Sequence, residues 1–185
     1  MNLSDFILSL VSFNSEELED ILSCFEKEKI LKNTMLVRQG EISKFLYFIE
    51  EGIGRSFYLK EDGKEVTQWF FSRGKFMTSL DSFFQQAPSL YNLEVLEDAT
   101  VYVISKENLD KLFAKYHKME QLGRLVSIEM LTKAVNKLKA LQFQTAKERY
   151  EYMLEEFPDM SHRLPLGHIA SYLGMTQETL SRIRK

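Results

Sequence analysis

The spacing of apolar residues divides the chain into stretches of different character. An apolar side chain recurs every three or four positions over residues 3–10, and Asn14 to Glu17 precede a second run with the same spacing. Two short amphipathic helices, the second with a capped start, are therefore expected first. Between residues 30 and 105 the apolar runs become short and rich in β-branched and aromatic side chains, which predicts strands.

The middle stretch is expected to form an antiparallel, jelly-roll-like β-roll. Its β-rich runs are separated by dipeptides that end in glycine, and Asp62-Gly63 is typical of a tight hairpin. Residues 78–84 have helical spacing with room for one or two turns, which predicts a short helix inside the roll. The expected strands are 34–38, 45–50, 55–60, 66–71, 92–96 and 100–104, with turn glycines at Gly40, Gly52, Gly63 and Gly74.

After Ser105 the pattern predicts helices, over 106–115, 118–142 and 145–157. The second helix is ~25 residues and ~40 Å long. Its residues Ile128, Leu131, Val135 and Leu138 keep the spacing of a coiled-coil seam, which predicts dimerisation through this helix. The alternative is a helix packed only on its own domain, because Leu122, Val126 and Met130 form a second apolar face.

The segment from Leu164 to the C-terminus has the pattern of a helix-turn-helix. Gly174 is placed to end a first helix in a left-handed conformation, and Thr176 is placed as the N-cap of a second. Leu180 and Ile183 are expected to face inward. The outward polar side chains suit base edges: we expect Arg182 to contact guanine, Gln177 adenine and Glu178 cytosine. Thr176 and Ser181 belong to the same face, and Arg163, Arg184 and Lys185 are expected at phosphates.

The run from Gly174 to Arg182 resembles the turn and recognition helix of the Crp/Fnr family of transcription regulators. The β-runs with Gly40, Gly52 and Gly74 resemble the cyclic-nucleotide-binding-type roll of that family. The resemblance covers nearly the whole chain. It implies an α+β fold with a winged-helix-like C-terminal domain, a homodimer on an inverted repeat in double-stranded DNA, and RNA polymerase as a partner. Gln177 departs from the family's usual arginine, so the family's usual DNA site is not carried over.

The resembled family also indicates where a cyclic nucleotide would bind. Its members use a glutamate on the short helix for the ribose and an arginine on the next strand for the phosphate. The corresponding residues here are Thr78-Ser79 and Ser89-Leu90. Because burying an unpaired phosphate is costly, we expect no cyclic-nucleotide binding unless Arg73 or Lys75 supplies the charge. These hydroxyls are expected to cap and satisfy the loop backbone; whether an unidentified small molecule is the effector stays open.

The distribution of charge places the DNA-binding surface in the second half. Residues 1–105 carry 10 Lys and Arg against 17 Asp and Glu, whereas residues 106–185 carry 14 against 10. Duplex DNA selects for locally clustered cations rather than for the charge of the whole chain. The overall charge of −3 therefore does not exclude DNA as a partner.

Other chemistries lack the residues that they need. Cys24 is the only cysteine, so the chain cannot supply an iron–sulfur cluster, and it is expected to be a helical core thiol. His117, His162 and His168 lie outside the β-roll and are expected at the surface or as caps, with His168 on the exposed side of its helix. Residues 30–105 contain no histidine, which excludes a metal-dependent cupin. We therefore expect no cofactor, no metal and no enzyme activity.

The expected organisation is a sensor roll over 1–116, a dimerisation helix over 117–142 and a helix-turn-helix domain over 143–185. The start of the chain lacks the basic residues of a signal peptide, and no apolar run is long enough to span a membrane, which predicts a cytoplasmic location. A signalling module that responds to a small ligand without binding DNA is the alternative function.

Overall fold

The computed structural model describes residues 1–158, 160 and 162–184, which form two compact units. The first unit contains Met1–Tyr58 and Trp69–Val126, and the second contains Leu59–Gln68 and the chain from Ser127 onward. These units differ from the expected segments 1–116, 117–142 and 143–185 in two ways. The long helix contributes to both units, and a piece of a β-hairpin belongs with the C-terminal helices.

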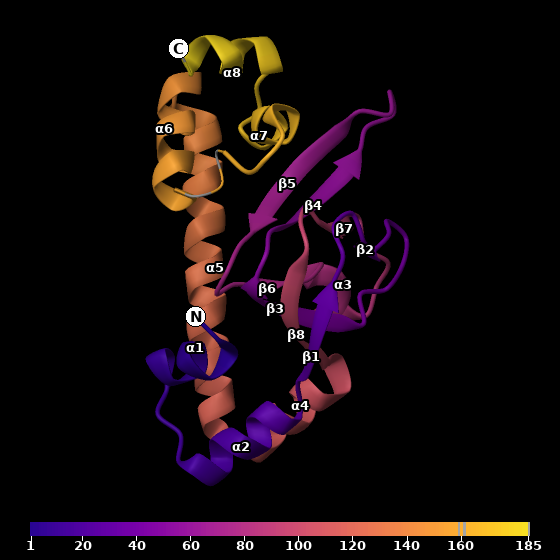
Figure 1. Cartoon of the computed structure of the whole chain (residues 1–185), viewed down its shortest axis with the longest axis vertical. Helices are drawn as coiled ribbons and strands as arrows, with labels where there is room; N and C mark the ends of the chain where they lie inside the picture. Colours follow the sequence, from indigo (N-terminus) through magenta and orange to yellow (C-terminus); the bar gives the residue numbers. More distant parts are fainter. Residues whose placement is uncertain (159, 161, 185) are drawn as a thin grey trace. The chain divides into compact units, whose positions relative to one another are not determined.

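The β-strands form two four-stranded antiparallel sheets (Figure 1). All six expected strands are present within one or two residues at each end. Two further strands, β1 and β6, were not expected. One sheet has the order β1 (Glu26–Ile30), β8 (Ala99–Ser105), β3 (Phe45–Glu51) and β6 (Phe76–Met77); the other has the order β2 (Met35–Val37), β7 (Asn92–Val95), β4 (Gly54–Leu59) and β5 (Glu65–Phe71).

The interior of the roll is filled by side chains from both sheets. Ile49, Leu93 and Val101 are fully buried there, and Trp69 packs against the same cluster. Gly54 lies close to Met77, and a Cβ at position 54 would force the methionine sulfur to move. Large side chains thus occupy the space between the sheets.

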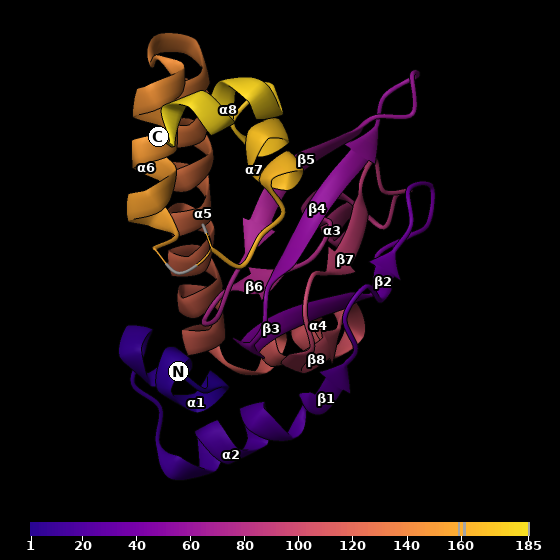
Figure 2. The same ribbon diagram turned by 45° about the horizontal axis from the view of Figure 1, so that its top comes forward.

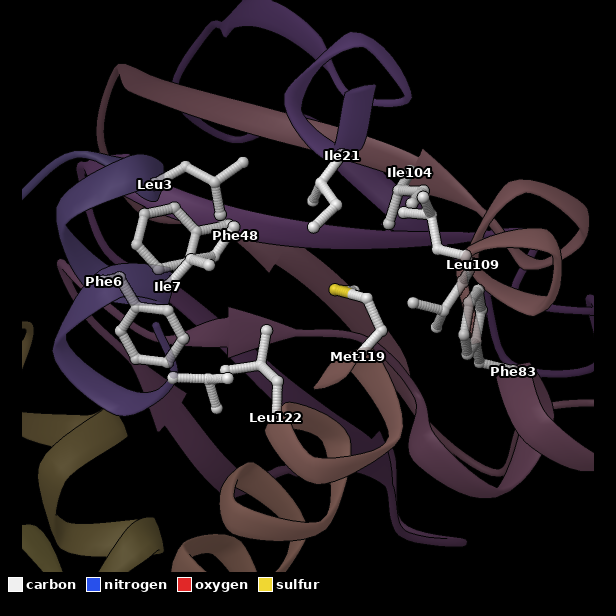
Figure 3. Packing of buried hydrophobic residues seen from close by; sticks show 12 residues of the cluster. Leu3, Phe6, Ile7, Ile21, Phe48, Phe83, Ile104, Leu109, Met119 and Leu122 are labelled. Carbon is white, nitrogen blue, oxygen red and sulfur yellow. The ribbon is translucent and has the colours of Figure 1, made fainter. Parts of the chain in front are cut away.

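A second apolar cluster joins the leading helices to the roll and to the long helix (Figure 3). The leading helices are α1 (Leu3–Leu10) and α2 (Ser15–Ser23), and the later helices are α4 (Lys106–Lys115) and α5 (His117–Phe143). Leu3 and Ile7 of α1 are buried with Phe48 of β3 and with Leu122 of α5. The apolar face of α5 that includes Leu122 and Val126 therefore packs on its own unit, as the alternative interpretation of this helix expected.

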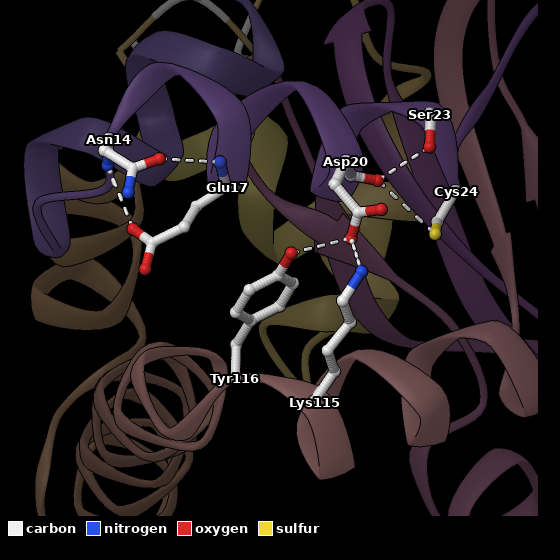
Figure 4. A network of polar contacts seen from close by, with 7 residues as sticks. All are labelled: Asn14, Glu17, Asp20, Ser23, Cys24, Lys115 and Tyr116. Atoms are coloured by element: carbon white, nitrogen blue, oxygen red, sulfur yellow. Dashed lines mark hydrogen bonds and ion pairs between the residues drawn. The ribbon is translucent and has the colours of Figure 1, made fainter.

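A polar network fixes α2 against the junction of α4 and α5 (Figure 4). Asn14 and Glu17 form a capping box at the start of α2, which satisfies two backbone amides. Farther along α2, the Asp20 carboxylate accepts hydrogen bonds from Lys115 Nζ and from the Tyr116 hydroxyl, each at 3.0 Å. Cys24 is the C-terminal cap of α2 and is partly buried beside the apolar cluster, as expected of a core thiol.

In the second unit, α6 (Ala146–Glu156) runs beside the later part of α5 and is followed by α7 (Leu166–Tyr172) and α8 (Gln177–Ile183) (Figure 2). Thr145 and Glu148 form a capping box that starts α6. The expected seam residues of α5 are exposed in the single chain, from 40% at Val135 to 65% at Leu131. No helix of the described residues is long and apolar enough to cross a membrane.

Candidate functional site

The turn between α7 and α8 has a defined backbone geometry. Gly174 has φ +65°, a left-handed conformation that favours glycine, as expected from the sequence. Its N–H donates to the Ser171 carbonyl at 3.2 Å, and the Met175 N–H donates to the Ala170 carbonyl at 3.0 Å. This pair of bonds is a Schellman motif, which satisfies carbonyls that the end of α7 leaves open. Thr176 then caps α8, because its hydroxyl accepts the Thr179 N–H at 3.2 Å.

Arg149 of α6 is bonded to this turn, a role that was not predicted from the sequence. Its Nε donates to the Leu173 carbonyl and its Nη1 donates to the Gln144 carbonyl, both at 2.8 Å. The two carbonyls lie at the C-terminal ends of α7 and α5, where a positive charge interacts favourably with the helix dipole. An arginine that follows a capping box is common in exposed helices, so only the fold identifies its role.

The outward face of α8 presents the polar residues that were expected to read DNA. Leu180 is fully buried beneath the helix, whereas Gln177, Glu178, Ser181 and Arg182 are exposed. Thr176, Arg163 and Arg184 are exposed as well, and Lys185 lies outside the described residues. The structure therefore brings Gln177, Glu178, Ser181 and Arg182 together on one helix. The assignment of each residue to a base or a phosphate stays a prediction.

The acidic and amide side chains at the start of α8 have local partners. Hydrogen bonds from the Glu178 backbone amide and from Thr176, together with the nearby Arg182 charge, lower the pKa of the Glu178 carboxyl. Glu178 is thus held as a carboxylate, which can only accept hydrogen bonds. A Cβ placed on Gly167 would lie 3.0 Å from the Gln177 amide nitrogen, so this amide rests over the first turn of α7.

The expected pocket residues Ser79 and Ser89 converge, but they bond to each other. Ser89 Oγ donates to Ser79 Oγ at 2.7 Å, and Ser79 Oγ contacts the Asp81 carboxylate at 3.0 Å. Ser79 precedes helix α3 (Leu80–Gln85) without a side-chain bond to its amides, so its expected capping role is wrong. Leu90 is 63% exposed and does not join the buried hydroxyls.

Neighbouring hydroxyls extend this network. Thr78 Oγ1 donates to the Phe45 carbonyl at 2.9 Å and lies 2.9 Å from Ser43 Oγ. Ser43, Thr78, Ser79 and Ser89 are each at least nine-tenths buried. The hydroxyls therefore satisfy one another and the loop backbone at the place where the resembled family holds a ribose and a phosphate.

The charged groups near the roll differ from those of a phosphate site. Arg55 of β4 is buried, but its Nε donates to the Glu94 carboxylate at 2.6 Å and its guanidinium lies 4.1 Å from the Phe57 ring centroid. Arg73, one of the cations considered as a substitute, is exposed. The burial of Arg55 was not predicted from the sequence, because the residues around it have the pattern of an ordinary β-strand.

The histidines do not form a ligand set. His117 and His162 are exposed, as expected, whereas His168 is partly buried and its Nε2 lies 3.9 Å from the Glu65 carboxylate. The expectation that His168 faces solvent is wrong, because a strand segment packs on that side of α7. Among the described residues, no three His, Cys, Asp or Glu side chains are grouped to hold a metal ion.

A β-roll, a long helix and a helix-turn-helix with an exposed polar recognition face together define a transcription regulator with a sensor-type domain. The cyclic nucleotide-binding domain family matches residues 27–116. The anaerobic regulatory protein of Haemophilus influenzae is 30% identical over 186 residues, which cover 93% of this chain and 71% of the relative. The fumarate and nitrate reduction regulatory protein of Yersinia pestis is 29% identical to this chain. The match covers 93% of this chain and 73% of the relative.

Solved structures show the same fold. FixK2 from Bradyrhizobium japonicum matches with a TM-score of 0.76 and 20% identity over 86% of this chain and 82% of that structure. The catabolite activator protein of Thermus thermophilus matches with a TM-score of 0.60 and 21% identity. The match covers 97% of this chain and 84% of that structure. The chain belongs to the Crp/Fnr family of transcription regulators.

Proposed function

We propose that this chain regulates transcription in the cytoplasm by binding, as a two-fold dimer, an inverted repeat in double-stranded DNA. The observation that carries the proposal is the exposed polar face of α8 on a turn held by the Schellman motif and by Arg149. A rigid turn fixes the direction of the recognition helix, which base readout in the major groove requires. RNA polymerase is the proposed protein partner, on the ground of family membership.

The proposed dimer uses the exposed seam of α5. Its residues are more than a third exposed in the single chain and follow one another at spacings of three and four, so a second copy of the helix would cover them. Two copies related by a two-fold axis present two α8 helices, ~34 Å apart for successive major grooves. The symmetry of the DNA site follows from the symmetry of the protein.

The sensor role is proposed to differ from that of cyclic-nucleotide receptors. The hydroxyl network of Ser43, Thr78, Ser79 and Ser89 supports a roll that keeps its fold without a nucleotide. Met77, which is fully buried inside the roll, and Trp69, which packs against the same cluster, support the same proposal.

The test is selection of binding sites from random duplex DNA by the whole chain. We expect enrichment of a sequence with inverted-repeat symmetry, bound with an affinity that falls as salt rises. Failure to enrich any sequence at low and moderate salt would overturn the proposal, and would favour a signalling module that does not bind DNA.

A further inference from the structure

A short segment of the β4–β5 hairpin packs with the C-terminal helices. Residues Leu59–Gln68 belong to the same compact unit as the later part of α5 and the helices α6 to α8. The segment includes the first residues of β5, whose remaining residues, Trp69 to Phe71, continue into the roll. The strand β5 thus contributes residues to both compact units.

Two contacts join this segment to α7. The Thr67 N–H donates to Ser171 Oγ at 3.1 Å, and the Glu65 carboxylate lies 3.9 Å from His168 Nε2. His168 and Ser171 are three residues apart, so they lie on the same face of α7. The strand therefore packs along one face of the first helix of the helix-turn-helix.

Lys137 of α5 completes the contact from a third element. Its Nζ donates to the Gln68 carbonyl and lies 3.8 Å from the ring centroid of Tyr172, the next residue along α7 after Ser171. A cation over an aromatic face is attracted by the ring quadrupole, and more strongly when water is excluded. One ammonium group thus touches the strand and α7 while it belongs to α5.

The contact leaves the DNA-reading face open. Gln177, Glu178, Ser181 and Arg182 of α8 are exposed, whereas His168, Ser171 and Tyr172 of α7 take the strand and the lysine. The arrangement therefore fixes the position of the helix-turn-helix without covering the residues that are expected to read bases.

We propose that Lys137 and strand residues 65–68 form a clamp that sets the position of α7, and through it α8, on α5, and that specific DNA binding requires the closed clamp. Lys137 is a positioning residue in this proposal. The proposal rests on the proposed function, since α5 is the helix through which two copies pair. The angle between α8 and α5 then sets the distance between the two recognition helices of the dimer. Because the spacing of major grooves in the duplex is fixed, this distance can vary little without loss of binding.

The clamp is expected to respond to pH near neutrality. Burial lowers the pKa of Lys137 to about 7, because the closed clamp disfavours the charged amine relative to a solvated lysine. Closing therefore releases a proton once the pH exceeds about 7, so the closed clamp is favoured as pH rises above that value. The other titratable groups that face the clamp are Glu65 of β5 and His168 of α7. Behind Tyr172 on α5 and α6 lie Lys133, Glu156 and Tyr152, which bond to one another through Glu156.

The experiment measures the affinity of the whole chain for its selected DNA site between pH 6 and 8. For the wild type, we expect affinity to rise by up to about tenfold across this range, because closing the clamp releases the Lys137 proton. Lys137→Met, which has no proton to release, should lose this pH dependence. Lys137→Arg, whose charge is permanent, should bind at every pH as the wild type does at pH 6.

Controls separate the clamp from other effects. Lys139→Met removes an exposed lysine of the same helix and should change neither affinity nor pH dependence beyond the loss of one surface charge. His168→Gln removes the imidazole beside Glu65 and should leave most of the pH dependence in place. Ser171→Ala, which deletes the acceptor of the Thr67 bond, should weaken DNA binding at every pH.

Stability distinguishes a positioning role from a folding role. The lowered pKa of Lys137 means that the folded state disfavours its charge. Lys137→Met should therefore unfold in urea at the same concentration as the wild type or a higher one, while its DNA affinity no longer depends on pH. A wild-type pH profile in Lys137→Met or in Lys137→Arg would overturn the clamp alone. Failure of the wild type to select DNA would instead overturn the proposed function, and the clamp with it.

Discussion

At the scale of single residues, two basic side chains contact the helix-turn-helix at different places. Arg149 satisfies carbonyls at the ends of α5 and α7, whereas Lys137 contacts α7 through the Tyr172 ring. The surrounding sequence does not distinguish either residue from the many other charged residues of its helix. Their roles depend on contacts between residues that are far apart in the chain, which periodicity does not reveal.

Replacing Arg149 should destabilise the second unit. In Arg149→Met the carbonyls of Leu173 and Gln144 lose their donors, and Leu173 is buried, so we expect a loss of about 2 kcal/mol in the free energy of unfolding. Urea denaturation followed by circular dichroism measures it. Lys147→Met, which changes an exposed side chain on the same helix, should stay within about 0.5 kcal/mol of the wild type. Equal stability of the two variants would contradict the role given to Arg149.

The pocket residues show what the sequence can predict at this scale. The start of the short helix placed Ser79, and counting back from Ser105 placed Ser89, as the pair that replaces Glu and Arg, and the structure brings their hydroxyl oxygens to 2.7 Å. Their bond to each other was not predicted, because hydrogen-bond direction depends on rotamers and on the Asp81 carboxylate nearby. Arg55 was missed for a related reason: only the fold pairs it with Glu94, 39 residues later.

At the scale of elements, the helices and most strands follow the sequence pattern closely. The predicted helix 118–142 is observed as His117–Phe143, and the helix-turn-helix has the expected turn glycine and N-cap. The two missed strands have physical reasons. β1 is a charged edge strand, Glu26 to Lys29, in which only Ile30 is buried, and β6 is two residues long and is defined by its pairing with β3.

The exposed face of α5 gives a prediction at this scale. The double variant Leu131→Glu and Leu138→Glu would place like charges along the seam in both copies, so we expect it to be monomeric. Sedimentation at tens of micromolar measures the mass. Thr132→Glu, an exposed position beside the seam, should leave the dimer intact. A wild-type chain that sediments as a monomer would contradict the seam, and α5 would then serve only its own chain.

At the scale of the whole molecule, the chain is a family member whose roll has an apolar cluster of its own side chains in its interior. Met77 lies in this interior, Trp69 packs against it, and the buried hydroxyls of Ser79 and Ser89 bond to each other. The family's sensor domain is thus present as a fold, whereas the residues for ribose and phosphate are not at the matching positions. The division into two compact units was not predicted, because the pairing of residues 59–68 with the C-terminal helices leaves no compositional mark.

Cyclic AMP should therefore not bind. Titration calorimetry with the whole chain should give no saturable heat at millimolar nucleotide, because an unpaired phosphate would have to displace a satisfied network. A dissociation constant in the micromolar range, equivalent to about 8 kcal/mol, would show that a cation such as Lys75 or Arg55 reaches the phosphate after all.

The most direct test of the whole account compares the DNA sites selected by the wild type and by two arginine variants. The account predicts an inverted repeat for the wild type. Arg182→Ala should relax preference at one base position in each half-site, at a cost of about 1–3 kcal/mol in discrimination, because Arg182 is the proposed guanine contact. Arg184→Ala should select the same sequence with a uniformly weaker affinity and a salt slope reduced by about one unit. An unchanged sequence preference for Arg182→Ala, together with an altered one for Arg184→Ala, would contradict the base-reading face assigned to α8.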